Sequence, residues 1–572
     1  MRVLINKQVA QLLNEIADLL EVQGDRFRPR AYRRAARQIE TLSEDIQEIY
    51  EKGGIENIPW VGSGIAKKVI EFLSTGKLEY LNELRREVDP GLSEIMEIEG
   101  IGPKTALLLH EKLNINTIDG LEEAAKDGRL RDIKGLGKKT EENILKGIET
   151  HRKYGKRFLL GFILPIALRI EDLLKNVEGV GRVSLAGSIR RRKDSIGDID
   201  VLATSSNPHM VMNAFTSMPP VIRILAKGET RSSVVLEGGA QVDLRVVDEK
   251  SFGSALQYFT GSKEHNIALR GIAVKRGWKL SEYSLEDRES GKKIAGETEA
   301  SIYNALGMSF IPPELRENRG EIPSAMANRI PNLVEHEEVR GDLHVHTKWS
   351  DGSATIKEMA ESAKALGLNY IAICDHSPSL KIARGLSPDD LKKQNKEIER
   401  VNREIEDFRV LAGIEVDIKS DGSLDSRNET LKDLDFVVAS VHTGFKISGE
   451  QMTDRIISAI HNDYVDVLGH PTGRLIQQRE PYDVDLNKVF VEATHLGVLM
   501  EINSFPSRLD LSDVNSRMAR DMGVIMCIGS DAHSVDQLEY LELGVATARR
   551  GWLERNDIIN CLPLHELQRR LR

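Results

Sequence analysis

The sequence has few cysteines and no apolar run long enough to cross a membrane. Its 572 residues include three cysteines, Cys374, Cys527 and Cys561, which form no CxxC pair and cannot all be joined in disulfides. This excludes a disulfide-stabilised scaffold and suits a reducing compartment. The longest apolar candidate, residues 158–170, falls short of the ~20 residues of a membrane-spanning helix and contains a proline and an arginine. The amino terminus is an amphipathic pattern with acids, unlike a signal peptide. We therefore expect a cytoplasmic protein with no membrane partner.

The chain also lacks an excess of positive charge. Its formal net charge is -10, which excludes a uniformly basic nucleic-acid-binding protein but leaves room for local basic surfaces. Hydrophobic residues make up 40% and charged residues 29% of the chain, as in ordinary soluble domains. At this length we expect roughly three or four domains.

The stretch from Gly187 to Asp200, GSIRRRKDSIGDID, indicates nucleotidyl transfer. Successive side chains of a strand alternate between its faces, so Asp198 and Asp200 point the same way. Asp243, in the alternating run AQVDLRVV, is the candidate third carboxylate from a neighbouring strand. Three carboxylates can hold two hard divalent cations, Mg²⁺ or Mn²⁺, for in-line phosphoryl transfer.

The residues ahead of these carboxylates are suited to a triphosphate. Gly187 and Ser188 offer backbone N–H groups and a hydroxyl where a helix can begin, and Arg190, Arg191 and Arg192 offer cations. The alternative is a turn with two solvated acids. The glycine, serine and arginines at this spacing favour nucleotidyl transfer over that alternative.

Two features of the first 150 residues point to nucleic-acid phosphates. Arginines recur at helical spacing with no compensating acid at i+4, so one helix face is cationic, although a solvated face is the alternative. Three glycine turns, each opening a helix, can bring backbone N–H groups close to a phosphate without reading a base. The DNA contacts predicted from these features are Arg30, Arg33, Arg34, Arg37, Gly62, Gly64, Gly100, Gly102, Lys104, Gly135, Gly137 and Lys138.

From about residue 338, strand-like and helical runs alternate, which predicts a parallel sheet and favours a barrel. Residue types that bind metals fall at the strand ends, where parallel barrels build their active sites. One histidine alone is more often a core or surface residue, but nine such residues exceed what one ion needs. Imidazole and carboxylate donors suit Zn²⁺, Mn²⁺ or Fe²⁺ and do not choose among them. The predicted ligands are His344, His346, Asp351, His376, Glu415, His442, His470, Asp531 and His533.

The glycine turns resemble helix-hairpin-helix DNA-binding motifs. The first of them, together with RAYRRAA at residues 30–36, resembles the amino-terminal lyase domain of family X DNA polymerases. The resemblance places the Schiff-base lysine of lyase-active members at Lys68, where desolvation and neighbouring cations favour a nucleophilic amine. Arg28 replaces another basic residue of that pocket, so phosphate contact by Lys67 and Lys68 is the alternative.

Residues 151–259 resemble the palm of the same family, in which the residues matching Asp198, Asp200 and Asp243 hold two metals and the third activates the primer 3'-hydroxyl. The run YFTGSKEHNIALR, residues 258–270, matches closely. By sequence alone, an aromatic pair before Thr-Gly-Ser more often marks a strand end. The nucleotide contacts implied by the resemblance are Gly187, Ser188, Arg191, Gly197, Tyr258, Phe259, Gly261, Asn266 and Arg270.

The ligand set near the carboxyl terminus matches the polymerase-and-histidinol-phosphatase (PHP) domain. The match implies a distorted seven-stranded barrel that hydrolyses phosphoesters with two or three divalent metals. By that resemblance, one metal is held by His344, His346, Glu415 and Asp531. A second, bridged by Glu415, is held with His442 and His470, and a third by Asp351, His376 and His533.

Other polar residues near these ligands are interpreted from their position. Asp375 is a candidate for supporting a histidine, and Lys381 and Arg384 for contacting phosphate. Glu501 and Asn503 stay open.

Along essentially its whole length the chain resembles bacterial and archaeal family X DNA polymerases. The implied fold is multidomain: α-helical helix-hairpin-helix repeats, an α+β nucleotidyltransferase palm with an α/β thumb, and a distorted (β/α)7 barrel. We predict a lyase-like domain over residues 1–90, fingers-like helix-hairpin-helix repeats over 91–150, a palm over 151–259, a thumb over 260–318, a linker over 319–337 and a PHP domain over 338–572.

The implied function is template-directed DNA polymerisation at short gaps in base excision repair. A metal-dependent 3'-5' exonuclease is expected in the PHP domain, where abasic-site endonuclease or 3'-phosphatase activity can share the metals. The expected substrates are gapped or primer-template DNA and deoxynucleoside triphosphates, and the expected state is a monomer. Two alternatives stay open: a non-templated nucleotidyltransferase, and a PHP phosphoesterase tethered to a DNA-binding module.

Overall fold

The computed structural model describes residues 3–25, 27–40, 42, 46–76, 78–96, 98, 100–133, 135–154 and 157–571. Internal contacts divide the chain into two compact units. One comprises Met1–Arg157 with Ser217–Ile222, and the other comprises Phe158–Thr216 with Arg223–Arg572. Among the described helices, none is both long and apolar enough to cross a membrane. The residue boundaries expected for the individual domains stay predictions.

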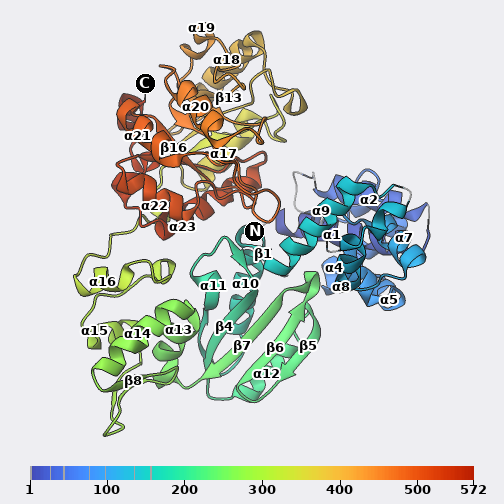
Figure 1. Cartoon of the computed structure of the whole chain (residues 1–572), viewed down its shortest axis with the longest axis vertical. Coiled ribbons are helices and arrows are strands. Elements are labelled where there is room, and N and C mark those ends of the chain that lie inside the picture. The colour runs from blue at the N-terminus through green and yellow to red at the C-terminus, as the bar shows by residue number, and fades with distance from the viewer. Residues whose placement is uncertain are drawn as a thin grey trace. The chain divides into compact units, whose positions relative to one another are not determined.

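The amino-terminal part of the first unit is helical and is drawn in blue to cyan in Figure 1. Its helices are α1 (Val3–Val22), α2 (Arg28–Glu40), α3 (Ile46–Glu51), α4 (Ser63–Thr75), α5 (Glu79–Glu87), α6 (Pro90–Met96), α7 (Pro103–Leu113), α8 (Ile118–Lys126) and α9 (Lys138–Tyr154). Apolar residues recur at helical spacing; in α1, Leu13, Ile16, Ala17 and Leu20 are at most 1% exposed. This spacing buries one stripe of each helix against its neighbours.

A mixed sheet follows. Its strands and helices are β1 (Phe158–Leu159), α10 (Leu160–Lys175), β2 (Val180–Leu185), α11 (Gly187–Arg190), β3 (Ser195–Ile196), β4 (Asp198–Ser205), α12 (Pro208–Thr216), β5 (Val221–Lys227), β6 (Arg231–Leu236) and β7 (Gln241–Val247). The main sheet has the order β2-β4-β7-β6-β5. Strands β4 and β7 are parallel neighbours, while β2 and β6 flank them antiparallel. The parallel pair at the middle places equivalent positions of β4 and β7 side by side.

The next segment combines helices with a small antiparallel sheet. Its elements are α13 (Phe252–Thr260), α14 (Lys263–Lys275), β8 (Trp278–Leu280), β9 (Leu285–Asp287), β10 (Lys293–Ala295), α15 (Glu299–Ala305) and α16 (Glu321–Met326). The aromatic pair Tyr258 and Phe259 therefore lies at the end of a helix, where the sequence alone favoured a strand end. Phe252, Ala255 and Leu256 of α13 are buried, and this apolar helical stripe explains the difference.

A buried cluster of three charged side chains joins this segment to the palm. Glu299 lies 2.6 Å from Arg190 Nη2 and 2.5 Å from Arg316 Nη1, and Arg316 is fully buried. Burial alone would raise the pKa of Glu299, but Arg316 and Arg190 outweigh it and hold the pKa at about 2. Arg190 is thus used in packing, contrary to the prediction that it offers its charge to phosphate.

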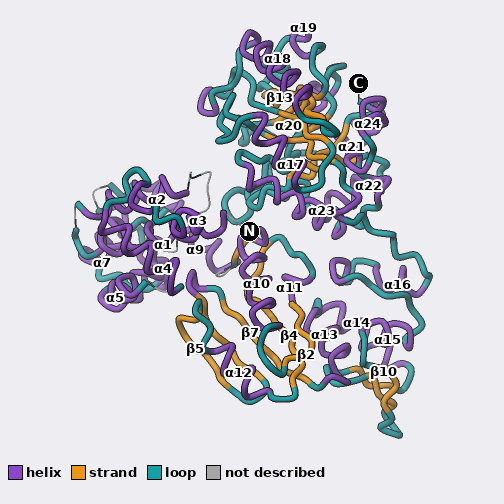
Figure 2. Tube along the Cα trace, turned by 180° about the vertical axis from the view of Figure 1, so that it is seen from behind, coloured by secondary structure: helices purple, strands orange, loops and turns teal. Residues whose placement is uncertain are grey.

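The carboxyl-terminal region is a parallel barrel, whose strands are orange in Figure 2. Its strands are β11 (Gly341–Val345), β12 (Tyr370–Ile373), β13 (Arg409–Asp417), β14 (Phe436–Ser440), β15 (Val467–Leu468), β16 (Leu499–Asn503) and β17 (Met526–Gly529). Its helices are α17 (Ile356–Ala365), α18 (Pro388–Glu404), α19 (Asn428–Leu431), α20 (Gly449–Ile460), α21 (Leu486–Leu496), α22 (Asp513–Asp521), α23 (Leu541–Arg550) and α24 (Leu564–Arg570).

The barrel strands pair in sequence order. A bridge between Val345 and Ala532 brings the first and last strands together, so the sheet is nearly closed. Most strand residues are buried, as expected when helices cover a parallel sheet. The structure confirms the predicted fold class, with a helical amino-terminal region, a mixed α+β region and a seven-stranded parallel barrel.

Candidate functional site

Three carboxylates meet on the two central strands of the palm sheet. Asp198 opens β4, and Asp200 follows two positions later on the same face. Asp243 lies opposite Asp200 in the parallel register with β7. Each of the three offers an oxygen within 4.8 Å of the others. The structure therefore brings together the three carboxylates that the sequence singled out.

Neighbouring groups set the charge of this cluster. Ser233 Oγ donates to one oxygen of Asp243, and Gln241 Nε2 donates to the other at 2.9 Å. Burial, with help from Asp198 and Asp243, raises the pKa of Asp200 to about 7. Like charges at this distance are unfavourable unless a cation compensates them. The oxygen donors and their crowding fit hard divalent cations.

Gly187 lets α11 approach the carboxylates. Its φ is 60°, and a Cβ at this position would overlap Asp200 Oδ2. The backbone N–H of Ala186 donates to Asp200 O at 2.8 Å, which fixes the start of α11 on β4. Ser188 lies within α11, and Gly197 stands immediately before β4. These two candidate triphosphate contacts are both partly buried.

Arg191 follows α11 and is held by two groups. Its Nη1 donates to Thr260 O at 2.6 Å, and its Nε donates to Glu317 Oε1 at 3.1 Å. Gly261 has a φ of 71°, and a Cβ there would lie 3.1 Å from Arg191 Nη1. The next residue, Arg192, extends to within 3.4 Å of a glutamate of α23.

The aromatic pair at the end of α13 is flanked by cations. The rings of Tyr258 and Phe259 meet edge to face, with centroids 5.1 Å apart. The guanidinium of Arg245 lies 4.5 Å from the Phe259 centroid, and that of Arg270 lies 5.8 Å from the Tyr258 centroid. Asn266 Nδ2 donates to Tyr258 O at 2.7 Å. The four residues implied as nucleotide contacts here thus form one connected group.

The first glycine turn differs from the other two in the residue that adopts the left-handed conformation. Gly100 has a left-handed φ of 89°, and Gly102 caps α7. In the first turn the left-handed position is Trp60, with a φ of 68°, and Gly62 caps α4. Gly64 lies inside α4, so by its capping position Gly62 corresponds to Gly102.

The third turn repeats the second. Gly135 has a left-handed φ of 101° and, like Gly100, has open space where a Cβ would be. Gly137 O accepts the first helical hydrogen bonds of α9. Lys104 and Lys138 are exposed at the starts of their helices, although Lys104 Nζ lies 3.2 Å from Glu21. Both turns keep the exposed N–H groups and cations that a phosphate contact requires.

The arginine face of α2 is compensated in part by α1. Arg33 Nη2 lies 2.8 Å from Asp18 and 2.5 Å from Glu21. No acid stands at i+4 from these arginines in α2, but α1 supplies the two acids that pair with Arg33. Arg34 lies 5.0 Å over the exposed ring of Trp60. Arg30, Arg34 and Arg37 are exposed.

Lys68 lies on α4 and is half-buried. Its Nζ is 4.3 Å from the Tyr80 ring centroid and 3.4 Å from Gly64 O. Arg28 Nη1 donates to Tyr80 Oη at 3.0 Å. Partial burial lowers the pKa of Lys68; nearby Glu71 opposes this shift and Arg28 adds to it. A lysine with a lowered pKa is more often neutral and hence nucleophilic.

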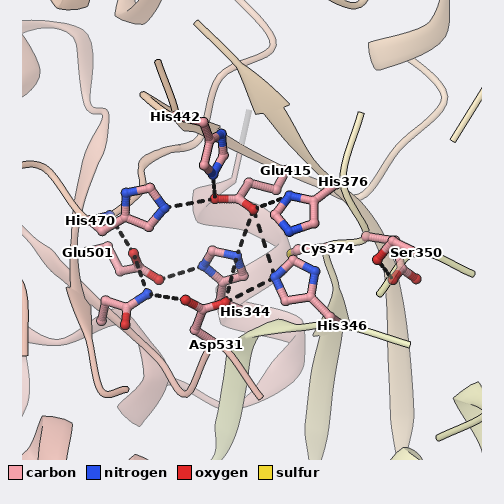
Figure 3. Close-up of polar contacts among 12 residues, drawn as sticks. His344, His346, Ser350, Cys374, His376, Glu415, His442, His470, Glu501 and Asp531 are labelled. Carbon is pink, nitrogen blue, oxygen red and sulfur yellow. Dashed lines mark hydrogen bonds and ion pairs between the residues drawn. The ribbon is translucent and has the colours of Figure 1, made fainter. Parts of the chain in front are cut away.

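Most of the predicted metal ligands of the barrel gather around Glu415, as Figure 3 shows. This carboxylate is 1% exposed. One oxygen lies 3.0 Å from His470 Nε2 and 3.3 Å from His442 Nε2, and the other lies 2.8 Å from His376 Nδ1. These residues come from the ends of β13, β14, β15 and β12, as expected for a site at the carboxyl edge of parallel strands.

The first and last strands complete the cluster. Asp531 Oδ1 lies 3.1 Å from His346 Nε2 and 4.0 Å from His344 Nε2. His533 Nε2 lies 3.3 Å from Asp351 Oδ1. All nine predicted ligands thus converge on one site.

Some histidine ring nitrogens at this site lack a well-aligned hydrogen-bond partner, whose place a bound metal would take. Among the described residues, Nε2 of His344 and Nε2 of His346 are buried and make no hydrogen bond of good geometry, although both face Asp531 Oδ1. A buried polar atom without a partner costs about 1–3 kcal/mol. A bound cation would satisfy these nitrogens, so the residues present fit divalent metals.

The carboxylates of this site favour the protonated, positively charged form of two of its histidines. Burial alone would lower the pKa of His442, but Glu415 and Asp417 outweigh it and raise the pKa to about 9. Burial would likewise lower the pKa of His533, but Asp351 and Asp531 raise it to about 9. Protons are therefore held tightly where metals would bind.

Donor atoms within 4.8 Å of one another form three groups in the barrel, and these differ in detail from the implied partition. His344 and His346 group with Asp531. His346 also groups with Asp351, His376 and His533, while His376 also groups with Glu415 and His442. His346 and His376 each lie between two groups, so the partition of ligands among three metals stays a prediction.

Residues behind the ligands hold them in place. Glu501 Oε1 lies 2.6 Å from His344 Nδ1, and its other oxygen accepts from the backbone of His470 at 2.5 Å. Asn503 Nδ2 donates to Asp531 at 3.1 Å. Asp417 lies 3.3 Å from His442 Nδ1. Sequence reasoning left the first two open and missed Asp417, although it stands two positions after Glu415 on the same strand face.

Asp375 has a different role from the predicted support of a histidine. It accepts hydrogen bonds from Thr347 Oγ1 at 2.6 Å, Ser350 Oγ at 2.5 Å and Gln394 Nε2 at 2.5 Å. These contacts join the loop after β11 to α18. The reason is orientation: the carboxylate lies in the chain beside His376 but faces that loop.

One cation contacts a ligand of the barrel site, and two more lie on the loop that follows His376. Arg508 Nε is 3.5 Å from Asp531 Oδ2, and no pattern in the sequence singled it out. Lys381 and Arg384 are exposed on the loop after His376. The loop closes where Leu386 N donates to His376 O at 2.8 Å. These arginines and the lysine are the candidate phosphate contacts of the barrel.

Descriptions of known domain families match four segments of the chain. A helix-hairpin-helix domain matches residues 5–78, and a SAM-like helix-hairpin-helix tandem matches residues 92–150. The thumb of DNA polymerase beta matches residues 255–317. The PHP domain matches residues 342–503.

Characterised relatives cover different parts of the chain. A DNA polymerase/3'-5' exonuclease PolX of Bacillus subtilis is 36% identical over 565 residues, which is 98% of each chain. A probable phosphatase of Thermoanaerobacter sp. is 38% identical over 205 residues, or 34% of this chain and 78% of that protein. DNA polymerase lambda of Rattus norvegicus is 27% identical over 344 residues, or 54% of this chain and 56% of that protein.

Proposed function

Because this chain belongs to the family X DNA polymerases that carry a PHP domain, we propose that it copies a template across short DNA gaps during base excision repair. The observation that carries this proposal is the set of carboxylates Asp198, Asp200 and Asp243 close to Gly187, the first residue of α11. The substrates are gapped or primer-template DNA and deoxynucleoside triphosphates. The metals at the palm are Mg²⁺ or Mn²⁺.

The side chains at the palm have separate roles in the proposed reaction. Asp243, oriented by Ser233 and Gln241, accepts the proton of the primer 3'-hydroxyl at a carboxylate oxygen. Arg191 orients the triphosphate, and Tyr258 and Phe259 pack against the sugar of the incoming nucleotide. Divalent cations, when bound, supply charge neutralisation for phosphate oxygens at the palm and a more acidic water at the barrel.

For the barrel we propose a 3'-5' exonuclease that can share its metals with abasic-site endonuclease or 3'-phosphatase activity. Two relatives support phosphoester hydrolysis: one is named a 3'-5' exonuclease, and the other, similar to about a third of this chain, a probable phosphatase. Zn²⁺, Mn²⁺ and Fe²⁺ suit the histidine and carboxylate donors. Arg508, close to Asp531, is placed to hold a phosphate oxygen of the DNA end.

A labelled primer on a gapped duplex tests both activities. With Mg²⁺ or Mn²⁺ and nucleotides, the primer should be extended by template-matched nucleotides, and without nucleotides it should shorten. Equal extension on single-stranded DNA would instead favour a non-templated nucleotidyltransferase. Shortening without any extension would leave the alternative of a phosphoesterase tethered to a DNA-binding module.

We propose that Lys68 removes 5'-deoxyribose phosphate by forming an imine. The lowered pKa of Lys68 beside Arg28 supports this activity. Borohydride should trap wild-type protein on an incised abasic duplex, and Lys68→Ala should reduce the trapped adduct by about 10²-fold, as loss of a covalent nucleophile does. Lys67→Ala, which removes the exposed neighbour, is the matched control. Unchanged trapping in Lys68→Ala would assign this lysine to phosphate contact.

Metal affinity at the barrel should rise with pH. The pKa values of His442 and His533 are raised from 6.5 to about 9 without metal. Their protons stabilise the metal-free fold fully below pH 6.5, and this stability is lost as the pH rises through about 9. Because a ligating histidine must lose its proton, affinity should increase over the same window.

Calorimetry of Mn²⁺ binding in two buffers of different ionisation enthalpy measures these protons. At pH 7 we expect about two protons to be released as the histidine ligands fill. In parallel, the melting temperature of chelated protein should fall between pH 6.5 and 9. Binding without proton release at pH 7 would contradict the assignment of these histidines as ligands.

A further inference from the structure

The palm and the barrel belong to the same compact unit, and one arginine of the barrel reaches the palm. Arg550 ends α23 and is 6% exposed. Its Nη1 donates to the backbone carbonyl of Arg191 at 2.6 Å and to Glu317 Oε1 at 3.1 Å. Its Nη2 donates to Asp513 Oδ2 at 2.7 Å. The side chain of Arg550 therefore contacts the backbone of Arg191, the arginine proposed to bind the triphosphate.

The two arginines share one oxygen. Glu317 Oε1 accepts from Arg191 Nε at 3.1 Å and from Arg550 Nη1 at 3.1 Å. Burial alone would raise the pKa of Glu317, but Arg550 and Arg191 outweigh it and lower it. A buried carboxylate keeps the cation that neutralises it. Because Arg550 supplies that charge, Arg191 can leave Glu317 for a phosphate at lower cost.

The backbone contact has a separate effect. The carbonyl of Arg191 ends the short helix α11, and the next residue, Arg192, has a left-handed φ of 55°. A charged donor on that carbonyl fixes the turn. The conformation of this turn sets the direction in which the Arg191 side chain leaves the backbone.

We propose that Arg550 is a positioning residue for nucleotide binding, through which the PHP domain keeps Arg191 available to the incoming triphosphate. The inference rests on the proposed role of Arg191 at the palm. It gives the barrel a part in polymerisation that is independent of its metals, because Arg550 contacts none of the predicted ligands.

The test is single-nucleotide gap filling by the full chain, with KM for the nucleotide and kcat measured separately. Arg550→Met should raise KM by about tenfold or more, the scale of a lost charge-assisted hydrogen bond, with kcat changed by no more than about threefold. Degradation of single-stranded DNA should keep its wild-type rate. Arg550→Lys should recover part of the loss.

Two further variants separate positioning from general loosening of the fold. Arg549→Met is the matched control, because Arg549 precedes Arg550 on α23 and pairs with Glu314 and Glu335 instead. It should leave KM unchanged. Arg550→Met with Glu317→Gln should bring KM back to within about threefold of wild type, because the neutral side chain no longer retains Arg191.

Each outcome decides a different point. A wild-type KM in Arg550→Met, or an equal rise in Arg549→Met, would overturn the inference. No recovery in the double variant would also overturn it. If Arg191→Met itself leaves KM unchanged, the proposed role of Arg191 fails together with the inference. If Arg191→Met raises KM but Arg550→Met does not, the role of Arg191 stands and only the inference fails.

Discussion

Replacing Asp198 and Asp200 together with asparagine should lower primer extension by about 10³-fold or more, the scale on which charge-stabilising groups act in enzymes. The substitutions keep the shape of β4 but remove two of three carboxylates that face one another. Single-nucleotide incorporation under single-turnover conditions measures the loss. Extension at the wild-type rate would show that polymerisation takes place without this cluster.

The stability of the same variant gives an internal check. Burial and like charges raise the pKa of Asp200 to about 7, so the ionised cluster is unfavourable without metal. The double variant should melt at the same or a higher temperature than wild type in the presence of a chelator. Asp248→Asn, an exposed acid one residue after β7, is the control and should leave extension unchanged. A lower melting temperature would attribute lost extension to misfolding.

Glu415→Gln should abolish most of the nuclease activity and leave polymerisation unchanged. Glu415 touches His376, His442 and His470, and its charge is the common centre of these contacts. Since even supporting groups behind metal ligands are worth about 10–100-fold, degradation of a labelled single strand should fall by about 10²-fold or more. Metal analysis should find at least one ion fewer per chain.

The control for this change is Glu429→Gln, an exposed acid in the first turn of α19. It should leave both metal content and degradation unchanged. A Glu415→Gln variant that loses metal but degrades DNA normally would place the nuclease elsewhere. A variant that keeps its metals and loses degradation would give Glu415 a role in the reaction beyond binding.

Most of both sites could be predicted because the determining patterns are short. Strand alternation places Asp198 and Asp200 on one face, and the alternating run around Asp243 marks its strand as a neighbour. In the barrel, polar residues at the ends of parallel strands share one edge whatever the loop lengths are. That rule is enough to bring His344 and Asp531 together from opposite ends of the domain.

What the sequence did not indicate depends on partners far away in the chain. Arg190 looks like a phosphate ligand until Glu299 is seen beside it, and Arg33 looks unpaired until α1 supplies Asp18 and Glu21. In the first hairpin, Trp60 occupies the left-handed position that a glycine occupies in the other two. Each case depends on tertiary packing, which the spacing of residues along the chain does not reveal.

The closing of the barrel has a consequence for how the protein is made. His344 and His346 come from the first strand, whereas Asp531 and His533 follow the last. A chain leaving the ribosome folds from its amino terminus, so the palm with all three aspartates is complete while the barrel still lacks its final ligands. The palm carboxylates can therefore meet before the barrel closes, whereas the barrel ligands can meet only when synthesis is nearly over. A chain cut short by a premature stop before residue 531 would keep the palm carboxylates but lose both the last barrel ligands and Arg550, which contacts the backbone of Arg191.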